Sequence, residues 1–311
     1  MNGLELSRSY WETVAKPDLE QQYPELLPHV AVGLVGNGSE CFGYDDERSR
    51  DHDWGIDFFL WVREENRAAI PTLQAWKEDL MGRHPPEYAR RRSQYGALID
   101  VMSVCDFYQS LIGVPGVPQT IWEWRLVPEE NFALAVNGAV FFDPFGAFTA
   151  VRQGLLDYYP EDLRRKKIAA RCMAMAQTGQ YNYRRTAERG EWVTLELILS
   201  RFISETMGLV YHLNRTYRPY YKWTWRRLRE LPVLGAEIFG LLLCLTQTGF
   251  LTFEARRSQQ VQIEAICALL AQKLREQGLS SCTGDFLARH GEFIQNTIQD
   301  ARLKSIPPQY E

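Results

Sequence analysis

Two closely spaced aspartates in the first half of the chain have the residue types and spacing of a metal site. Asp51 and Asp53 come just before the apolar run Ile56–Val62. If a strand begins at or just before Asp51, their side chains share one face with Asp57, because strand side chains alternate with a period of two. Crowded carboxylates repel one another, and Mg²⁺ offsets the repulsion while bridging carboxylates to substrate phosphates.

A separate aspartate, Asp100, interrupts the apolar run Ala97–Val104, where an uncompensated charge is costly. If its strand lies beside that of Asp51 and Asp53, three carboxylates converge from two strands. Such a set holds two metal ions for in-line phosphoryl chemistry. We therefore predict these three aspartates as catalytic metal ligands for two Mg²⁺ ions, with Mn²⁺ as an alternative, and Asp57 as a supporting residue.

A glycine-rich turn precedes the acidic segment. Gly38 and Ser39 follow the apolar run Val30–Gly36, and bare N–H groups and a hydroxyl in a tight turn can approach phosphate oxygens closely. We predict a phosphate-binding turn here; the alternative is an ordinary solvated loop. The acids of 45–47 are interpreted as solvated loop charges.

In the second half, the run Tyr211–Arg229 holds six basic residues, six Tyr or Trp residues and no acid. Aromatic planes can stack on a base, and Lys or Arg can meet phosphates. We predict that Lys222, between Tyr221 and Trp223, contacts the triphosphate. The alternative is that the aromatic side chains fill the core while the arginines stay solvated. The basic cluster of 164–167 is interpreted as the solvated side of a helix.

The elements that must position these residues change character along the chain. Apolar runs predict strands at 30–36, 56–62, 97–104 and within 137–144, with helices near 4–23 and 64–81. Beyond 147, the periodicity predicts helices only. We expect an α+β protein: residues 1–146 form a small mixed sheet with helices on one side, and residues 147–311 form an all-α helical bundle.

Composition limits the classes of function. The chain has 311 residues, is 45% hydrophobic and carries a formal charge of −4, which argues against a nucleic-acid or membrane partner. The N-terminal residues do not resemble a signal peptide, and the longest apolar stretch, Ile238–Leu245, is far shorter than the roughly 20 residues of a membrane span. We expect a cytoplasmic protein with reduced cysteines.

The order of these motifs resembles a known signature. Gly38-Ser39, eleven residues, Asp51-His52-Asp53 and a separate strand with Asp100 are similar to the pattern of the polymerase-β-like nucleotidyltransferase superfamily. More narrowly, GLVGNGSECFGYDDERSRDHDWG, with the early SRSYWETVAKPDL and the late NRTYRPYYKW, resembles a bacterial family catalogued as a domain of unknown function within that superfamily. His52 departs from the pattern, which usually has an apolar residue there.

The resemblance implies a fold, an activity and a role for each residue. The helical domain would close a nucleotide cleft. Gly38 and Ser39 would hold the β- and γ-phosphates, Asp51 and Asp53 would bind both Mg²⁺ ions, and Asp100 would complete the metal site nearest the attacking hydroxyl. The activity would be transfer of a nucleoside monophosphate from an NTP to a hydroxyl-type acceptor, expected to be a small molecule, with release of pyrophosphate.

Two alternatives remain at this point. One is a nucleotide-binding module without turnover, and the other is an enzyme of the toxin–antitoxin type that modifies a protein or a tRNA. The acceptor, the base of the NTP and the oligomeric state stay open.

Overall fold

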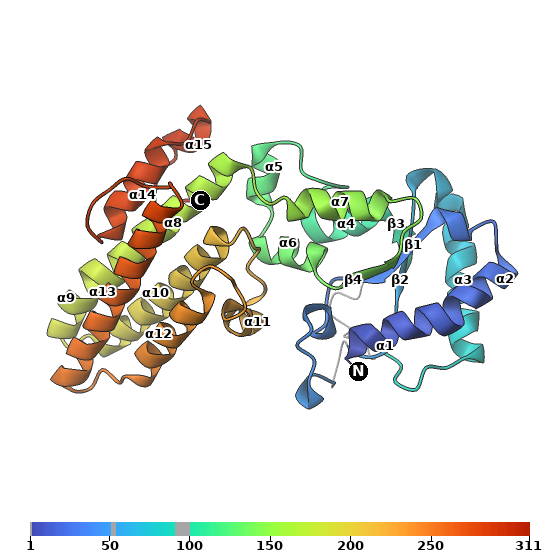
Figure 1. The fold of residues 1–311 in the computed structure, drawn as a ribbon, viewed down its shortest axis with the longest axis horizontal. Coiled ribbons are helices and arrows are strands. Elements are labelled where there is room, and N and C mark those ends of the chain that lie inside the picture. The colour runs from blue at the N-terminus through green and yellow to red at the C-terminus, as the bar shows by residue number, and fades with distance from the viewer. Residues whose placement is uncertain (1, 51–53, 91–99) are drawn as a thin grey trace. The chain divides into compact units, whose positions relative to one another are not determined.

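The chain folds as two compact units. The computed structural model describes residues 2–50, 54–90 and 100–311. The first unit is Met1–Asp157 and the second is Tyr158–Glu311 (Figure 1). The fold is α+β and mostly helical, with a small mixed sheet in the part of the chain that is described.

The sheet belongs to the first unit, and its described strands follow the order β3-β2-β1-β4. They are β1 (Val30–Leu34), β2 (Phe59–Val62), β3 (Val101–Ser103) and β4 (Ala139–Phe142). β2 runs antiparallel to β1, with Phe59 opposite Gly33, and parallel to β3, with Leu60 opposite Val101. The end of β1 and the beginnings of β2 and β3 therefore lie at one edge of the sheet.

One face of the sheet is covered by helices from two parts of the chain. These are α1 (Gly3–Tyr10), the π-helical turn Trp11–Ala15 and α2 (Lys16–Gln22), followed later by α3 (Ile70–Arg83). Their apolar side chains share one core with Val32 of β1 and Leu60 of β2. The helix predicted near 4–23 is thus present, with a π-helical turn inside it.

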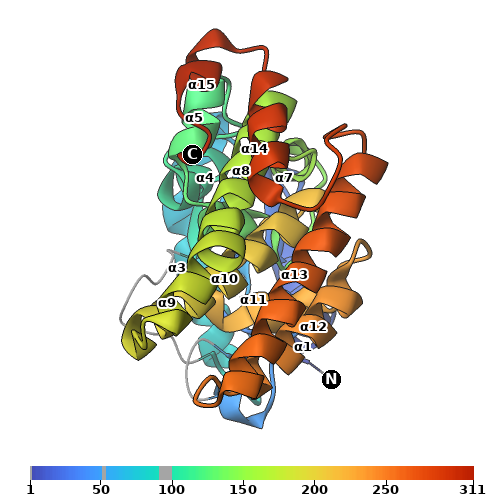
Figure 2. The same cartoon turned by 90° about the vertical axis from the view of Figure 1, so that its left-hand side faces the viewer.

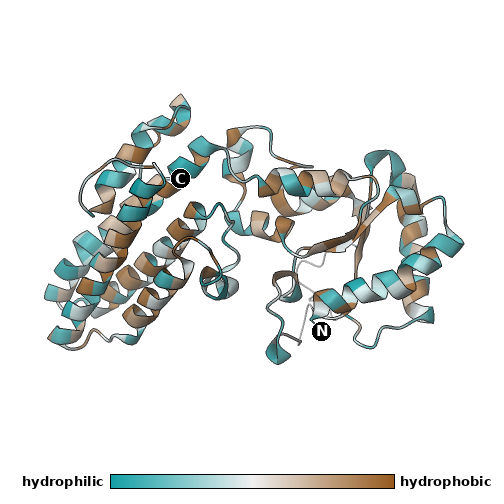
Figure 3. Ribbon diagram, in the orientation of Figure 1, coloured by the Kyte–Doolittle hydropathy of each residue, from teal (hydrophilic) through white to brown (hydrophobic). Residues whose placement is uncertain are grey.

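The opposite face is covered as well. Trp61 of β2 stacks on Phe148 of α7 (Ala147–Leu156), with ring centroids 3.9 Å apart, and meets Phe107 of α4 (Val104–Ile112) edge to face. Every residue of β1 and β2 is buried, which is typical of strands covered on both sides. The strands are accordingly hydrophobic (Figure 3). Helices lie on both faces, and not on one side as the sequence analysis expected.

The second strand begins later than predicted, at Phe59. Just upstream of it, the N–H of Ile56 donates to the carbonyl of Tyr88 at 2.7 Å, whereas the N–H groups of Asp57 and Phe58 donate to side chains, to Ser7 Oγ at 3.2 Å and to Asp57 Oδ1 at 2.8 Å. Gly55 also has φ of +129°, outside the strand region. A strand beginning by Asp51 that contains Gly55 and Asp57 is therefore wrong.

The helix expected over 64–81 also begins later. Residues Glu64–Ala69 form a 3₁₀ helix, and the α-helix α3 starts at Ile70. Pro71 explains the change, because proline lacks an N–H and fits the first turn of an α-helix, where that N–H has no partner.

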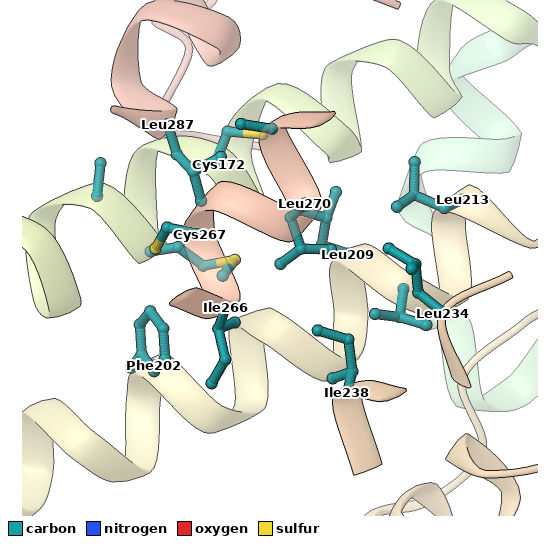
Figure 4. Packing of buried hydrophobic residues seen from close by; sticks show 14 of the residues in the cluster. Cys172, Phe202, Leu209, Leu213, Leu234, Ile238, Ile266, Cys267, Leu270 and Leu287 are labelled. Carbon is teal, nitrogen blue, oxygen red and sulfur yellow. The ribbon is translucent and has the colours of Figure 1, made fainter. Parts of the chain in front are cut away.

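The described elements of the second unit are all helical. The longer ones are α8 (Glu161–Met175), α10 (Trp192–Leu213), α12 (Gly235–Gln247), α13 (Phe253–Glu276) and α14 (Leu287–Asn296). α8 packs between α10 and α14 (Figure 2). Between the helices, Phe202, Ile266 and Leu270 belong to one core that also takes in two cysteines, Cys172 and Cys267 (Figure 4).

The shorter helices complete the two units. In the first unit, α5 (Ile121–Leu126) and α6 (Glu129–Val136) precede β4. In the second, the short helices are α9 (Tyr183–Glu188), α11 (Tyr221–Leu228) and α15 (Ala301–Ser305), with a π-helical segment over Ala176–Asn182. None of the helices in the described ranges is long and apolar enough to cross a membrane.

The division between the units differs from the predicted boundary. The sequence placed it at 146–147, where strand patterns give way to helix patterns, but the compact units meet at Asp157–Tyr158. The reason is α7, which is a helix by pattern and yet packs on the sheet through the buried side chain of Phe148.

Three of the four residues in the basic cluster at the start of α8 are buried, contrary to the interpretation of the cluster as a solvated face. Arg164, Lys166 and Lys167 are 4%, 0% and 5% exposed. Lys166 Nζ donates to Gln295 Oε1 at 2.9 Å and to the carbonyl of Ile306 at 2.7 Å. These acceptors come from the last helices of the chain, so the sequence near α8 carried no sign of them.

Two substitutions of glycine by alanine test the close approach of the chain at the junction between β1 and β4. Gly138 has φ of +59°, and a Cβ built on it would lie 1.9 Å from the carbonyl oxygen of Leu34. Gly82 is in α3 with nothing within 4 Å of its Cβ position. We expect Gly138→Ala to lower the free energy of unfolding by more than about 2 kcal/mol and Gly82→Ala to raise it by about 0.5–1 kcal/mol. Urea unfolding followed by circular dichroism measures both; equal effects would contradict the close approach.

Candidate active site

The predicted site residues are grouped by one edge of the sheet. Gly38 and Ser39 follow the end of β1, and Asp100 directly precedes β3, where its carbonyl accepts a hydrogen bond from the N–H of Leu60 at 2.8 Å. Asp100 therefore lies just before the strand. The sequence had suggested a position within it. Asp51 and Asp53 lie outside the described residues.

The turn after β1 holds backbone donors ready for a ligand. Gly36 and Gly38 have φ of +110° and +117°, which residues with a side chain rarely adopt. The side chain of Asn137 fixes the turn by accepting from the N–H of Gly36 and donating to its carbonyl, each at 2.7 Å. Among the described residues, the N–H groups of Gly38 and Ser39 have no acceptor. Successive N–H groups of this kind are what a phosphate needs.

A buried ion pair supports the same turn. Arg90 donates to Glu40 Oε1 at 2.7 Å and to the carbonyl of Asn37 at 2.6 Å. The side chains of Arg90 and Glu40 are only 5% and 0% exposed. Because burial removes the hydration of both charges, each depends on its pairing. The pair therefore ties the turn to the segment that contains Arg90.

One of the loop acids has a structural role that its sequence position did not indicate. Asp45 Oδ2 accepts hydrogen bonds from the N–H of Gly3 at 2.8 Å and from Trp54 Nε1 at 2.9 Å. The interpretation of Asp45 as a solvated charge is thus wrong, whereas Asp46 and Glu47 are exposed. Asp45 thereby links Trp54 to Gly3 at the start of α1.

Asp100 shares a buried lysine with Asp57. Lys77 Nζ lies 2.7 Å from Asp57 Oδ1, 3.0 Å from Asp100 Oδ2 and 2.6 Å from the carbonyl oxygen of Phe58. The lysine side chain is 3% exposed, that of Asp57 8% and that of Asp100 19%. The ammonium group thus joins residues just upstream of β2 and β3.

These groups open onto a pocket of about 390 Å³. Its polar lining comes from Asp57, Lys77, Asp100, Glu78 and Arg90. Its apolar lining comes from Ile56, Met81, Pro85, Pro86 and Ala89. Half of the lining residues are thus charged, and convergent charged groups beside apolar surface can fix the orientation of a small polar molecule.

Asp100 has the chemistry of a cation ligand, because a cation already lies against its carboxylate in the form of the Lys77 ammonium. In the described part of the chain, no three His, Cys, Asp or Glu side chains are arranged to hold a metal ion. The two partners predicted for Asp100 are Asp51 and Asp53, outside the described residues. Of the predicted ligands, only the carboxylate of Asp100 is among the described residues, and the Mg²⁺ site stays a prediction.

Lys222 belongs to the second unit. It is exposed on α11, and its Nζ lies 5.0 Å from the centre of the Trp223 ring. Part of the aromatic run around it is packing, as the alternative interpretation held: Trp225 stacks on Phe239 at 4.1 Å, and Tyr211 is buried. A contact between Lys222 and a nucleotide stays a prediction.

Lys77, Arg90 and Glu40 are not among the site residues predicted from the sequence. A signal existed for one of them. Lys77 falls between Trp76 and Leu80 on the apolar face of α3, where a lysine must find a buried partner. No local pattern indicated the pairing of Arg90 with Glu40, which are fifty residues apart.

Removing Arg90 tests the support of the turn. Arg90→Ala removes a hydrogen-bonded cation from the fully buried Glu40, so we expect a loss of about 3–5 kcal/mol in the free energy of unfolding. Arg8→Ala, which breaks an exposed pair with Glu12, is the control and is expected to cost at most about 1 kcal/mol. Chemical unfolding measures the free energy of unfolding of the two variants. Similar losses in both would show that the buried pair does not stabilise the turn.

Comparison with known proteins gives one match. Residues 124–224 match the domain of unknown function DUF4037. The matched segment runs from α5 into α11 and contains Lys222, but none of Gly38, Ser39 or the three aspartates. No curated protein and no solved structure matches the chain. The chain thus shares about a third of its length with a family whose name assigns no activity.

Proposed function

We propose that the protein is a magnesium-dependent nucleotidyltransferase that transfers a nucleoside monophosphate from an NTP to a hydroxyl-type acceptor and releases pyrophosphate. The single observation that carries this proposal is the strand register. It brings the turn of Gly38 and Ser39 to the same sheet edge as Asp100 and the segment upstream of β2.

The donors at this edge match the parts of a bound triphosphate. The N–H groups of Gly38 and Ser39 suit phosphate oxygens, and the pocket beside Asp100 suits a small acceptor. Asp51, Asp53 and Asp100 would hold the two Mg²⁺ ions. Bound Mg²⁺ would neutralise charge on the phosphates and polarise the phosphorus that is attacked.

The reaction is an in-line displacement. The acceptor oxygen attacks the α-phosphorus, a new O–P bond forms, and the bond from the α-phosphorus to the oxygen that bridges to the β-phosphate breaks. Pyrophosphate leaves with that electron pair. Asp100 orients the acceptor hydroxyl and takes its proton, the Gly38-Ser39 turn holds the departing pyrophosphate, and Lys222 contacts the triphosphate. Positioning and charge complementarity supply the rate enhancement.

Binding of the nucleotide can be tested before the acceptor is known. We expect one of ATP, CTP, GTP and UTP, with MgCl₂, to raise the melting temperature. A ligand at a hundred times its Kd adds about 2.7 kcal/mol to the free energy of unfolding. Thermal-shift assays with and without MgCl₂ measure this. If no triphosphate produces a magnesium-dependent shift, the proposed function is wrong.

The metal ligands can be tested by isosteric change. Asp51→Asn or Asp53→Asn should abolish magnesium-dependent pyrophosphate release, because each removes a charged ligand while keeping the side-chain volume. Glu47→Gln, a change at a nearby exposed acid, should retain activity. Pyrophosphate release is measured with the preferred NTP and extracts of small metabolites as acceptors. Full activity in the Asp51→Asn/Asp53→Asn double variant would exclude the mechanism.

A radioactively labelled NTP shows whether the acceptor is a small molecule or a macromolecule. With an α-³²P-labelled NTP, a small-molecule acceptor predicts a labelled metabolite. Label on protein or tRNA would instead indicate an enzyme of the toxin–antitoxin type, and nucleotide binding without transfer would indicate a silent module.

A further inference from the structure

The second unit holds a pocket between two of its helices, α9 and α13, which pack against each other (Figure 1). This α9–α13 pocket has a volume of about 470 Å³ and is lined by residues within 183–188 and 253–260. Pockets of about 300–1,000 Å³ are typical of small-molecule sites. None of the binding residues predicted from the sequence lines it, so the side chains of the pocket itself indicate what it could bind.

The inner wall of the pocket is fixed and carries no charge. Tyr183 is 1% exposed, and its hydroxyl donates to Gln259 Oε1 at 2.6 Å. Gln259 in turn donates to the carbonyl of Thr248 at 2.6 Å. Burial raises the pKa of Tyr183 to about 12, so its phenol stays neutral. The charge of the pocket therefore comes from the side chains closer to its mouth.

Two arginines bring positive charge that no carboxylate balances. Arg256 Nη1 donates to the carbonyls of Phe250 at 2.9 Å and Leu251 at 3.0 Å, and its guanidinium lies 5.0 Å from the centre of the Trp192 ring. Arg257 is exposed and has no hydrogen-bond or ion-pair partner among the described residues. One guanidinium is thus held in place and the other is open to solvent, and both keep their full charge.

The remaining charges of the lining cancel each other. Arg184 Nε lies 2.7 Å from Glu188 Oε1, and Glu188 is the only acid among the described residues of the lining. Three arginines and one glutamate leave an excess of two positive charges. A phosphate ester carries about −1.5 to −2 at neutral pH and has three oxygens for guanidinium groups, whereas a carboxylate carries one charge. The excess therefore favours a phosphate ester.

An aromatic ring lies at the same pocket. Phe253, the first residue of α13, is 68% exposed, and within the described ranges its ring contacts no other ring. An exposed aromatic face can stack on a planar ring of a ligand. Inorganic phosphate would leave this face uncovered. The combination of charge and ring favours a ligand that has both a phosphate and a planar group.

We propose that the α9–α13 pocket binds a small phosphate ester that carries a planar ring, with Arg256 and Arg257 on the phosphate and Phe253 on the ring. The site goes beyond the proposed function, because no residue of the sheet edge takes part in it. It gives the second unit a small-molecule site of its own.

Binding is measured by isothermal titration calorimetry on the full chain in EDTA, with phenyl phosphate and methyl phosphate as probes. We expect phenyl phosphate to bind about fivefold or more tightly than methyl phosphate. Arg257→Gln removes a cation that no protein carboxylate balances, so the Kd for phenyl phosphate should rise about tenfold or more. Phe253→Ala should remove the preference for the phenyl ester.

A gain of affinity provides a test that a damaged fold cannot imitate. Glu188→Gln removes the negative charge of the lining and releases Arg184, so the Kd for phenyl phosphate should fall about threefold or more. Arg289→Gln is the matched control, because Arg289 is an exposed arginine of α14 that does not line the pocket, and it should leave the Kd unchanged.

A third probe, AMP, distinguishes two sources of the ring. Tighter binding of AMP than of phenyl phosphate would identify a nucleotide as the ligand class, and weaker binding would identify a smaller ester. Either result supports the site if Arg257→Gln weakens the binding.

The outcomes are independent of the nucleotidyl-transfer proposal, because EDTA removes Mg²⁺ and none of the probes is a triphosphate. If the native protein binds neither phenyl phosphate nor AMP, or if Arg257→Gln binds them as tightly as the native protein, the pocket is not such a site. Magnesium-dependent transfer would still stand. Conversely, an absent magnesium-dependent shift with NTP would leave the α9–α13 pocket untouched.

Discussion

The pairing of β2 with both of its neighbours is the constraint on which the first unit depends. Antiparallel pairing with β1 places the exit of β1 beside the entrance of β2. Parallel pairing with β3 adds the entrance of β3 to the same edge. Polar segments that are distant in sequence thereby become neighbours, while the apolar side chains of the strands are buried on both faces. A one-residue slip would turn those side chains over and separate the polar segments.

The buried charged side chains at this edge are paired with side chains of opposite charge. Arg90 with Glu40 lies under the glycine turn, and Lys77 with Asp57 and Asp100 lies under the pocket. Each cation is almost fully buried and therefore depends on its carboxylates. These pairs limit the ways in which the loops at the edge can be arranged, which is how a set of short segments can present donors in fixed positions.

The second unit is organised differently. Its apolar core lies between long helices, and the buried Lys166 and Lys167 near the start of α8 pair with the last segments of the chain. The match to the domain of unknown function covers the beginning of this unit and the end of the first. It includes Lys166 and Lys167, whose partners come from α14 and the segment beyond it.

How much could be predicted from the sequence depended on how local each property is. Periodicity indicated the α+β class, the four apolar runs that contain strands and the helical second half, because alternation and helical spacing are set by neighbours within a few residues. Composition and spacing also singled out the turn at Gly38 and the isolated Asp100, which the structure places at one sheet edge.

The tertiary structure decided what depends on distant partners. Just upstream of β2, the N–H of Asp57 donates to Ser7, which is fifty residues away in the sequence, and Phe148 of α7 packs on Trp61, which places α7 with the first unit. The burial of Lys77 follows from carboxylates that only the folded sheet brings within 3 Å. A sequence specifies which side chains carry charge, but a buried charge is tolerated only where the fold supplies its counterion, and that position exists only in three dimensions.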